Sequence, residues 1–131
     1  MEKVDKTSLN SVLIVDDEEE IGLLLKRILR KKFEIIEHAL TLKEGLAYSL
    51  LLKPNIILLD NNLPDGSGIE RLSEFTASYP DACIIIVSAM THLQDQALEN
   101  GAFAFIEKPW SFDKIIETIE AARNKSGLPL E

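Results

Sequence analysis

Apolar and polar positions follow one another along the chain in short blocks, and these blocks predict a repeated strand–helix order. Four apolar runs are brief and rich in aliphatic or β-branched residues, and a fifth follows a glycine; they cover residues 12–15, 33–36, 56–59, 84–87 and 102–106. Runs of this length and composition are typical of strands covered on both faces, as in a parallel sheet between helices.

The segments between these runs have the apolar spacing of amphipathic helices, with residues three or four positions apart. The predicted apolar positions are Ile21, Leu24, Leu25, Ile28 and Leu29, then Leu42, Leu46, Leu50 and Leu51, then Ile69, Leu72 and Phe75, then the short stretch 93–98, then Ile115, Ile116 and Ile119. Thr41, Ser67 and Thr91 each stand three residues before Glu or Gln, the capping-box pattern, and Ser111 can cap the last helix. Five strand–helix units predict an open α/β sheet of parallel strands with helices on both faces.

Length and composition bound the function without identifying it. The 131 residues predict one domain, and 14 basic against 22 acidic residues give a net charge of −8. This balance argues against non-specific nucleic-acid binding and against docking on an anionic membrane. The single cysteine, Cys83, excludes an intramolecular disulfide and fits a reducing compartment. Without a signal peptide or an apolar run of membrane-spanning length, the sequence predicts a cytoplasmic domain.

Polar residues follow four of the five predicted strands, at the end where open α/β sheets bind their ligands. These residues are Asp16 and Asp17 after the first strand, Asp60 after the third, Ser88 after the fourth and Lys108 after the fifth. Each has an ordinary interpretation by itself, as a helix N-terminal charge, a turn former, a cap or a solvated lysine. Those interpretations do not explain why all of them fall at the same end of successive strands.

The combination of these residue types favours metal-assisted phosphoryl chemistry. Crowded carboxylates remain ionised together only when a cation lies among them. The cluster contains no His or Cys, so its oxygen ligands favour Mg²⁺ or Mn²⁺ over zinc. An aspartate beside such a metal can attack phosphorus and form an acyl phosphate. Lys108 then offers a positive charge, and Ser88 a hydroxyl, for the phosphoryl oxygens.

Five motifs, in order and at this spacing, make the chain resemble the receiver domain of two-component response regulators over about residues 11–123. They are VLIVDDE at 12–18, NIILLD at 55–60, Leu63-Pro64 with Gly66 and Gly68, IIIVSA at 84–89, and GAFAFIEKP at 101–109. The resemblance implies a flavodoxin-like (βα)₅ fold whose five-stranded parallel sheet has the order 2-1-3-4-5. It leaves residues 1–10 as a flexible N-terminal extension and 124–131 as a C-terminal tail or the start of a linker.

The resemblance also implies a role for each site residue. Asp60 would be the phosphoacceptor, taking its phosphoryl group from a phosphohistidine of a sensor histidine kinase or histidine phosphotransfer protein. Asp17 would bind the metal directly, Asp16 directly or through water, and Asn62 through its backbone carbonyl. Such a domain is a signalling switch that assists its own phosphorylation and dephosphorylation, and it is not a metabolic enzyme.

The switch itself is implied in the same way. Ser88 and Lys108 would bind the phosphoryl oxygens, and Phe105 would move inward when Ser88 is drawn to the phosphate. This would change the surface formed by the fourth helix, fifth strand and fifth helix, where an unidentified output partner or a second copy of the chain would bind. Ser and Phe stand where Thr and Tyr are commoner, and the Lys108–Pro109 peptide bond is expected to be cis.

Two other functions compete with the receiver hypothesis. A phosphatase with an aspartyl nucleophile usually carries a second carboxylate two residues later, where this chain has Asn62. An FMN carrier would place the cofactor phosphate beside three carboxylates that repel it. Among the remaining residues, Cys83 is expected in the core, His38 and His92 on the surface, and Trp110 in packing. The first helix carries the basic residues Lys26, Arg27, Arg30, Lys31 and Lys32, which form either a solvated face or, as the resemblance implies, a docking site for the phosphodonor.

Overall fold

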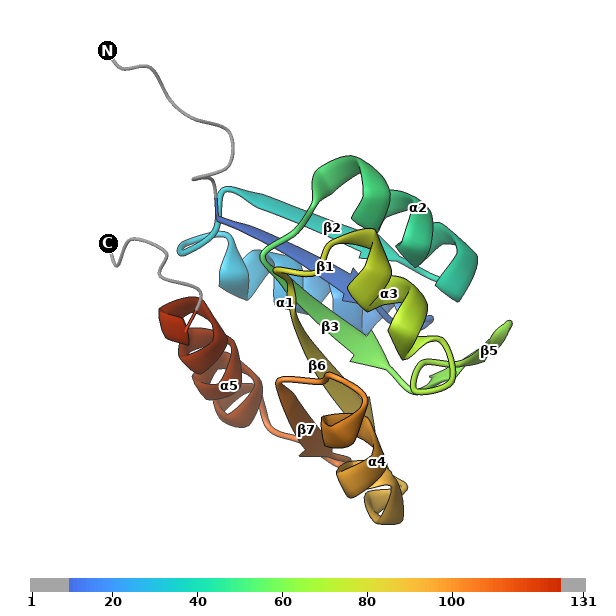
Figure 1. Cartoon of the computed structure of the whole chain (residues 1–131). Helices are drawn as coiled ribbons and strands as arrows, with labels where there is room; N and C mark the ends of the chain where they lie inside the picture. The colour runs from blue at the N-terminus through green and yellow to red at the C-terminus, as the bar shows by residue number, and fades with distance from the viewer. Residues whose placement is uncertain (1–9, 126–131) are drawn as a thin grey trace.

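The computed structural model describes residues 10–125, and within them strands and helices alternate as the sequence predicts (Figure 1). The elements are β1 (Ser11–Val15), α1 (Glu19–Leu29), β2 (Ile35–Ala39), α2 (Leu42–Leu52), β3 (Ile56–Asp60), β4 (Asn62–Leu63), β5 (Gly66–Ser67), α3 (Leu72–Ser78), β6 (Cys83–Ser88), the 3₁₀ turn η2 (Thr91–Leu93), α4 (Gln94–Glu99), β7 (Ala104–Glu107) and α5 (Phe112–Lys125). The expected N-terminal extension and C-terminal tail lie almost entirely outside the described residues.

The main sheet has five parallel strands in the order β2-β1-β3-β6-β7. With the two short strands left out of the count, this is the predicted order 2-1-3-4-5, and the flavodoxin-like α/β fold is confirmed. The short strands β4 and β5 form a separate antiparallel hairpin between β3 and α3. The sequence pattern did not predict this hairpin, because two-residue strands are too short to show a period.

The central strands are buried on both faces, which explains their unbroken apolar runs. Successive side chains of a strand point to opposite faces, so Val12 and Ile14 of β1 pack in one core while Leu13 and Val15 pack in the other. The first core lies under α1 and α5, and the second lies under α2, α3 and α4 (Figure 1). The layers therefore leave the carboxyl ends of β1, β3 and β6 as the place where polar residues can meet.

Two of the five strands begin later than predicted. The second was expected over 33–36 and spans Ile35–Ala39, and the fifth was expected over 102–106 and spans Ala104–Glu107. Phe33 is apolar because it is buried in the core before the strand begins. The strand also ends later than predicted, at Ala39, so His38 lies within β2 and is half-buried, and the expectation that it lies on the surface was wrong.

The apolar face predicted for α2 is also wrong in its second half. Leu50 is 61% exposed and Leu51 is 82% exposed, whereas Gly45 and Ser49 are buried. A β-carbon on Gly45 would lie 2.9 Å from Cγ2 of Val15, so α2 approaches the sheet through its small residues. Within residues 10–125, no helix combines the length and the apolar character needed to cross a membrane.

Only part of the predicted capping is present. The Glu44 amide donates to Thr41 Oγ1 at 3.1 Å, and the Lys114 amide donates to Ser111 Oγ at 3.1 Å. The boxes expected at Ser67 and Thr91 do not start α-helices, because α3 begins at Leu72 and α4 at Gln94, both without a side-chain cap. Ser67 Oγ does accept a 3.4 Å hydrogen bond from the Glu70 amide, as the predicted box requires, and its hydroxyl also donates to a buried side chain in the loop after β3.

Candidate functional site

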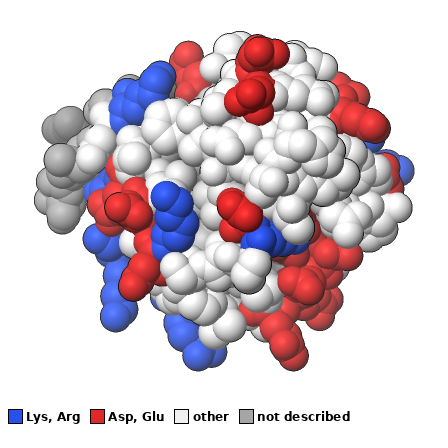
Figure 2. Space-filling model, turned by 90° about the horizontal axis from the view of Figure 1, so that it is seen from below, with Lys and Arg blue, Asp and Glu red and all other residues white. Residues whose placement is uncertain are grey.

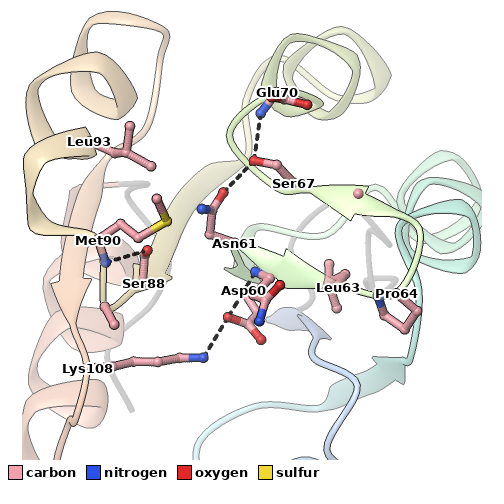
Figure 3. A pocket seen from close by; sticks show the side chains of 13 residues that line it. Asp60, Asn61, Leu63, Pro64, Ser67, Glu70, Ser88, Met90, Leu93 and Lys108 are labelled. Atoms are coloured by element: carbon pink, nitrogen blue, oxygen red, sulfur yellow. Dashed lines mark hydrogen bonds and ion pairs between the residues drawn. The ribbon is translucent and has the colours of Figure 1, made fainter.

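Asp60 is the last residue of β3, and its side chain is held in a buried position between two loops. The residue is 4% exposed, and Lys108 Nζ lies 2.9 Å from its Oδ1. Figure 3 shows the lysine side chain extended toward Asp60 across the pocket. Burial lowers the pKa of Lys108, but the hydrogen bond and negative charge of Asp60 outweigh it, and the net pKa is raised. The buried Asp60 and the half-buried Lys108 thus form a charge-assisted pair.

The loop after β7 is tied to β6, which is how Lys108 comes to face Asp60. The Lys108 amide donates to the Ser88 carbonyl at 2.9 Å, which continues the ladder between the two strands. The following Lys108–Pro109 peptide bond is cis, as expected from the resemblance. A lysine 48 positions away in sequence is therefore placed by the sheet itself.

Two further carboxylates reach the same place from the end of β1. One carboxylate oxygen from each of Asp16, Asp17 and Asp60 lies within 4.8 Å of the others. Burial raises the pKa of Asp16 to about 6, and the charge of Asp60 adds to the rise, although a 2.8 Å hydrogen bond from the Glu18 amide opposes it. The cluster lies between β1 and β3, where the strand order reverses, the usual ligand position in an open α/β sheet.

The donors in this cluster fit a hard divalent cation. Three carboxylates at this spacing offer the oxygen ligands that Mg²⁺ and Mn²⁺ prefer, and their mutual repulsion is relieved by positive charge. Asn62, the residue expected to offer its backbone carbonyl, is exposed at the start of β4. Its backbone nitrogen lies 3.5 Å from Asp60 Oδ1. The residues present are thus chemically suited to the metal that the sequence predicts.

Ser88 ends β6 on the other side of Asp60. It is buried, and its hydroxyl oxygen accepts a hydrogen bond from the Met90 amide at 2.9 Å. Phe105 lies in the neighbouring strand β7, paired with Ile86, and is half-buried against the core beneath α2, α3 and α4. The hydroxyl and the aromatic ring expected to switch therefore stand on adjacent strands.

His38 is a site residue that sequence reasoning missed. Its Nε2 lies 2.7 Å from the carbonyl oxygen of Asp16, the residue before Asp17. A β-carbon on Gly22 of α1 would collide with the His38 ring, so the glycine leaves the space that the ring occupies. Gly22 and His38 are thus matched in shape beside the carboxylate cluster.

Asn61 is the second missed residue. It stands between Asp60 and Asn62, is 7% exposed, and accepts hydrogen bonds from Ser67 Oγ at 2.7 Å and from the Ile69 amide at 2.9 Å. Figure 3 shows its side chain turned toward Ser67 at the rim of an open pocket of about 720 Å³. Leu63, Pro64, Met90 and Leu93 also line this pocket, which connects the acceptor to the solvent.

The surface beside the site carries charges of both signs. Figure 2 shows acidic and basic groups interspersed over the face seen from below, with a broad uncharged area beside them. A groove of about 540 Å³ lies between α1 and the loop after β7, with Leu24, Trp110 and Phe112 among its lining residues. The Trp110 and Phe112 rings make an edge contact with centroids 5.3 Å apart.

The remaining sequence expectations for single residues have clear outcomes. Cys83 is buried and packs in the core beneath α1 and α5, as expected. His92 is exposed, as expected. Trp110 packs partly against the same core, which confirms its structural role, while its position in the groove also leaves part of the ring accessible.

Comparison with known proteins gives one consistent family. A family model described as "Response regulator receiver domain" matches residues 12–120. The chemotaxis protein CheY of Listeria monocytogenes is 33% identical over 114 residues, which cover 85% of this chain and 96% of that protein. The KDP operon transcriptional regulatory protein KdpE of Escherichia coli is 32% identical over 116 residues, covering 87% of this chain and 51% of that protein.

Solved structures agree with these relatives. A CheY-like response regulator receiver domain protein from Methanospirillum hungatei superposes with a TM-score of 0.82 at 31% identity, covering 92% of this chain and 98% of that one. The beryllofluoride-activated NtrC4 receiver domain dimer gives a TM-score of 0.81 at 31% identity, covering 88% and 98%. The region matched by the family model includes every residue of the predicted site.

Proposed function

The chain belongs to the response regulator receiver domain family of two-component systems, and from this premise we propose that it is a switch that accepts a phosphoryl group on Asp60. The donor is a phosphohistidine of a sensor histidine kinase or histidine phosphotransfer protein. One observation carries the proposal: the buried Asp60 carboxylate is paired with Lys108 at 2.9 Å and lies among two further carboxylates. The relatives are signalling proteins rather than metabolic enzymes.

We propose that Mg²⁺, or Mn²⁺ in its place, is held by the carboxylates of Asp16, Asp17 and Asp60 and by the carbonyl of Asn62. When bound, the cation neutralises charge on the acceptor and on the phosphoryl oxygens. The raised pKa of Asp16 supports this assignment, because it reflects a buried carboxylate beside a like charge and thus a place where positive charge is favourable.

The transfer step uses Asp60 as the nucleophile. One carboxylate oxygen attacks phosphorus while the phosphorus–nitrogen bond of the phosphohistidine breaks, and the electron pair of that bond stays on the imidazole. No proton has to move onto Asp60, since its carboxylate is the attacking form. Lys108 is already 2.9 Å from the acceptor, so its ammonium can follow the negative charge onto a phosphoryl oxygen.

The switch step begins at Ser88. In the present structure its hydroxyl oxygen accepts from the Met90 amide, and the hydroxyl proton can be donated to a phosphoryl oxygen on Asp60. Drawing Ser88 toward that oxygen moves the loop that leads into η2 and opens space toward which Phe105 can turn. The surface formed by α4, β7 and α5 then differs between the two states, and a partner that binds this surface has a different affinity for each state.

The partners follow from the same surfaces. A second copy of the chain or an output partner would bind the α4, β7 and α5 surface, and the NtrC4 receiver domain is itself a dimer when beryllofluoride-activated. The phosphodonor would approach along α1, where Leu23 and Leu24 are exposed and where the groove beside Trp110 reaches Lys108. Exposed apolar side chains on α1, one of them in the groove that reaches Lys108, support a helical donor with an apolar face.

Phosphorylation with a small phosphodonor tests the proposal. The purified chain is incubated with acetyl phosphate and Mg²⁺, and intact-mass and peptide mass spectrometry locate the added phosphoryl group. We expect one group on the peptide that contains Asp60, and none when EDTA replaces Mg²⁺. Asp60→Asn should abolish the adduct while the protein remains folded. An adduct that persists in Asp60→Asn would rule out Asp60 as the acceptor.

A further inference from the structure

The loop after β3 is built around a buried amide that neither the motifs nor the proposed transfer step uses. Asn61 follows the acceptor directly and is 7% exposed, although asparagine is a residue that usually lies at the surface. A buried polar side chain has to be hydrogen-bonded to offset its desolvation. Asn61 Oδ1 meets this requirement by accepting from Ser67 Oγ at 2.7 Å and from the Ile69 amide at 2.9 Å.

The main chain of Asn61 is fixed as firmly as its side chain. Its amide donates to the Val87 carbonyl at 2.9 Å, and its carbonyl accepts from the Gly68 amide at 3.0 Å. A β-carbon on Gly68 would lie 2.6 Å from the carbonyl oxygen of Asp60, so the two backbone segments are in close contact. Asn61 therefore joins the end of β3 to β6 on one side and to residues 67–69 on the other.

These contacts act on the two neighbours of Asn61 in the chain. Asp60 precedes it, and Asn62, the proposed carbonyl ligand, follows it and pairs with Ser67 in the β4–β5 hairpin. A side chain that ties Ser67 to the end of β3 thus limits the positions available to both ligands at once. Partners of this indirect kind typically change metal affinity by about 10–100-fold when they are removed.

We propose that Asn61 is a positioning residue for the metal and acceptor site: its side-chain amide pins the β4–β5 hairpin and thereby sets Asp60 and Asn62 relative to Asp16 and Asp17. The inference rests on the proposed function, because it assumes that Asp60 accepts the phosphoryl group and that Asp60 and Asn62 bind the metal. An apolar residue of similar size would fill the same space but offer no acceptor to Ser67 and Ile69.

The test compares Asn61→Leu with Ser67→Ala and with the control Ser78→Ala. Asn61→Leu removes both hydrogen bonds, and Ser67→Ala removes one of them together with the 3.4 Å bond from the Glu70 amide. Ser78→Ala removes the hydrogen bonds of Ser78 to Ser49 and to the Phe75 carbonyl at the last residue of α3, outside the loop. Mg²⁺ affinity is measured by calorimetry and by the fluorescence of Trp110, the single tryptophan of the chain. Acetyl phosphate phosphorylation is then measured at limiting and at saturating Mg²⁺.

We expect Asn61→Leu to weaken Mg²⁺ binding by about 10-fold or more, and Ser67→Ala, which loses a single contact to Asn61, by about 2–3-fold. Phosphorylation of Asn61→Leu should be slow at limiting Mg²⁺, and saturating Mg²⁺ should largely restore its rate. Ser78→Ala should lose thermal stability with no change in Mg²⁺ affinity, which separates positioning from general destabilisation.

An unchanged Mg²⁺ affinity in folded Asn61→Leu would overturn the inference and leave Asn61 with a structural role only. If Asn61→Leu does not fold, Ser67→Ala decides, and an affinity equal to that of the original chain would overturn the inference as well. Failure of the unmodified chain to bind Mg²⁺ or to be phosphorylated on Asp60 would instead count against the proposed function.

Discussion

Two loops flank Asp60 at the same edge of the sheet, and they are held in different ways. The loop after β3 is anchored to other elements: Asn61 reaches β6, and the Asp65 carboxylate accepts from the Leu42 and Lys43 amides at the start of α2 at 2.9 and 3.0 Å. The loop after β6 makes hydrogen bonds between near neighbours, such as Met90 to Ser88 and Thr91 to Ala89. It leads into a single 3₁₀ turn and the six-residue α4, which has no side-chain cap.

This difference matches two different tasks. A metal site needs ligands that stay in place, and the anchored loop directly follows Asp60 and carries Asn62. A switch needs a segment with a second arrangement of similar free energy, and segments with local hydrogen bonds and exposed side chains open most easily. We infer that the loop after β3 is the fixed wall of the pocket and the loop after β6 is the part that responds.

Ser88→Ala is expected to have the largest effect on the difference between the two loops. Removal of the hydroxyl takes away the proposed link between the phosphoryl group and the loop after β6, while the anchored loop is untouched. Phosphorylation of Asp60 should persist at a rate lower by about tenfold, the equivalent of one hydrogen bond to a charged group. The response of residues 88–107, followed by hydrogen–deuterium exchange, should disappear. Ser73→Ala on the exposed side of α3 is the control, and a full response in Ser88→Ala would refute the proposed link.

The carboxylate cluster gives a pH-dependent prediction of intermediate size. Burial raises the pKa of Asp16 to about 6, so the folded, metal-free chain binds a proton that the unfolded chain releases near the ordinary value of 3.8. Between these values the free energy of unfolding due to Asp16 falls as pH rises, and the loss is complete above the folded pKa. Bound Mg²⁺ should offset this loss of stability.

Mg²⁺ affinity should change with pH in the opposite direction. Below about pH 6 a proton has to leave Asp16 before the cation can bind, so affinity should fall by up to about tenfold for each further unit. Calorimetric titrations on both sides of this pKa check the slope, and Asp16→Asn should lack this component. Equal slopes in the two proteins would show that Asp16 does not compete with the metal for a proton.

The smallest expected effect concerns Asp65, which ties the loop after β3 to the start of α2. Asp65→Ala removes two hydrogen bonds to the start of α2, and we expect it to lower the free energy of unfolding by about 0.5–2 kcal/mol, as loss of a helix cap does. These bonds hold the pKa of Asp65 below its usual range, so their contribution is present above the unfolded pKa and is lost as pH falls through the folded one.

Urea unfolding at neutral and at acidic pH checks this prediction, with Asp81→Ala, an exposed aspartate in the turn before β6, as the control. Asp65→Ala should also loosen the β4–β5 hairpin in hydrogen–deuterium exchange. If Asp65→Ala and Asp81→Ala lower the free energy of unfolding equally at neutral pH, the tie between the hairpin and α2 contributes no measurable stability.

The fold could be predicted from the sequence where burial on both faces leaves an unbroken apolar run, as in β1, β3 and β6. The polar residues that end those strands were then predicted to lie at one edge, and the structure brings Asp16, Asp17, Asp60 and Lys108 together there. Their chemical roles remain predictions that the experiments above test.

What sequence reasoning missed depends on contacts between residues far apart in the chain. The buried face of α2 is formed by small residues such as Gly45, so the leucine spacing pointed to Leu50 and Leu51. His38 and Asn61 looked like ordinary polar residues because their partners are a main-chain carbonyl and a distant hydroxyl and amide. No periodic pattern reports a contact of this kind.

Hydrogen–deuterium exchange of the unmodified chain, free and loaded with beryllofluoride and Mg²⁺, tests the central claim most directly. Beryllofluoride stands in for the phosphoryl group on Asp60, so the measurement compares both loops in the two states of one protein. We predict changes over residues 88–107 and little change over residues 61–72. Changes of equal size in both segments, or changes confined to residues 61–72, would contradict the division into a fixed wall and a responding loop.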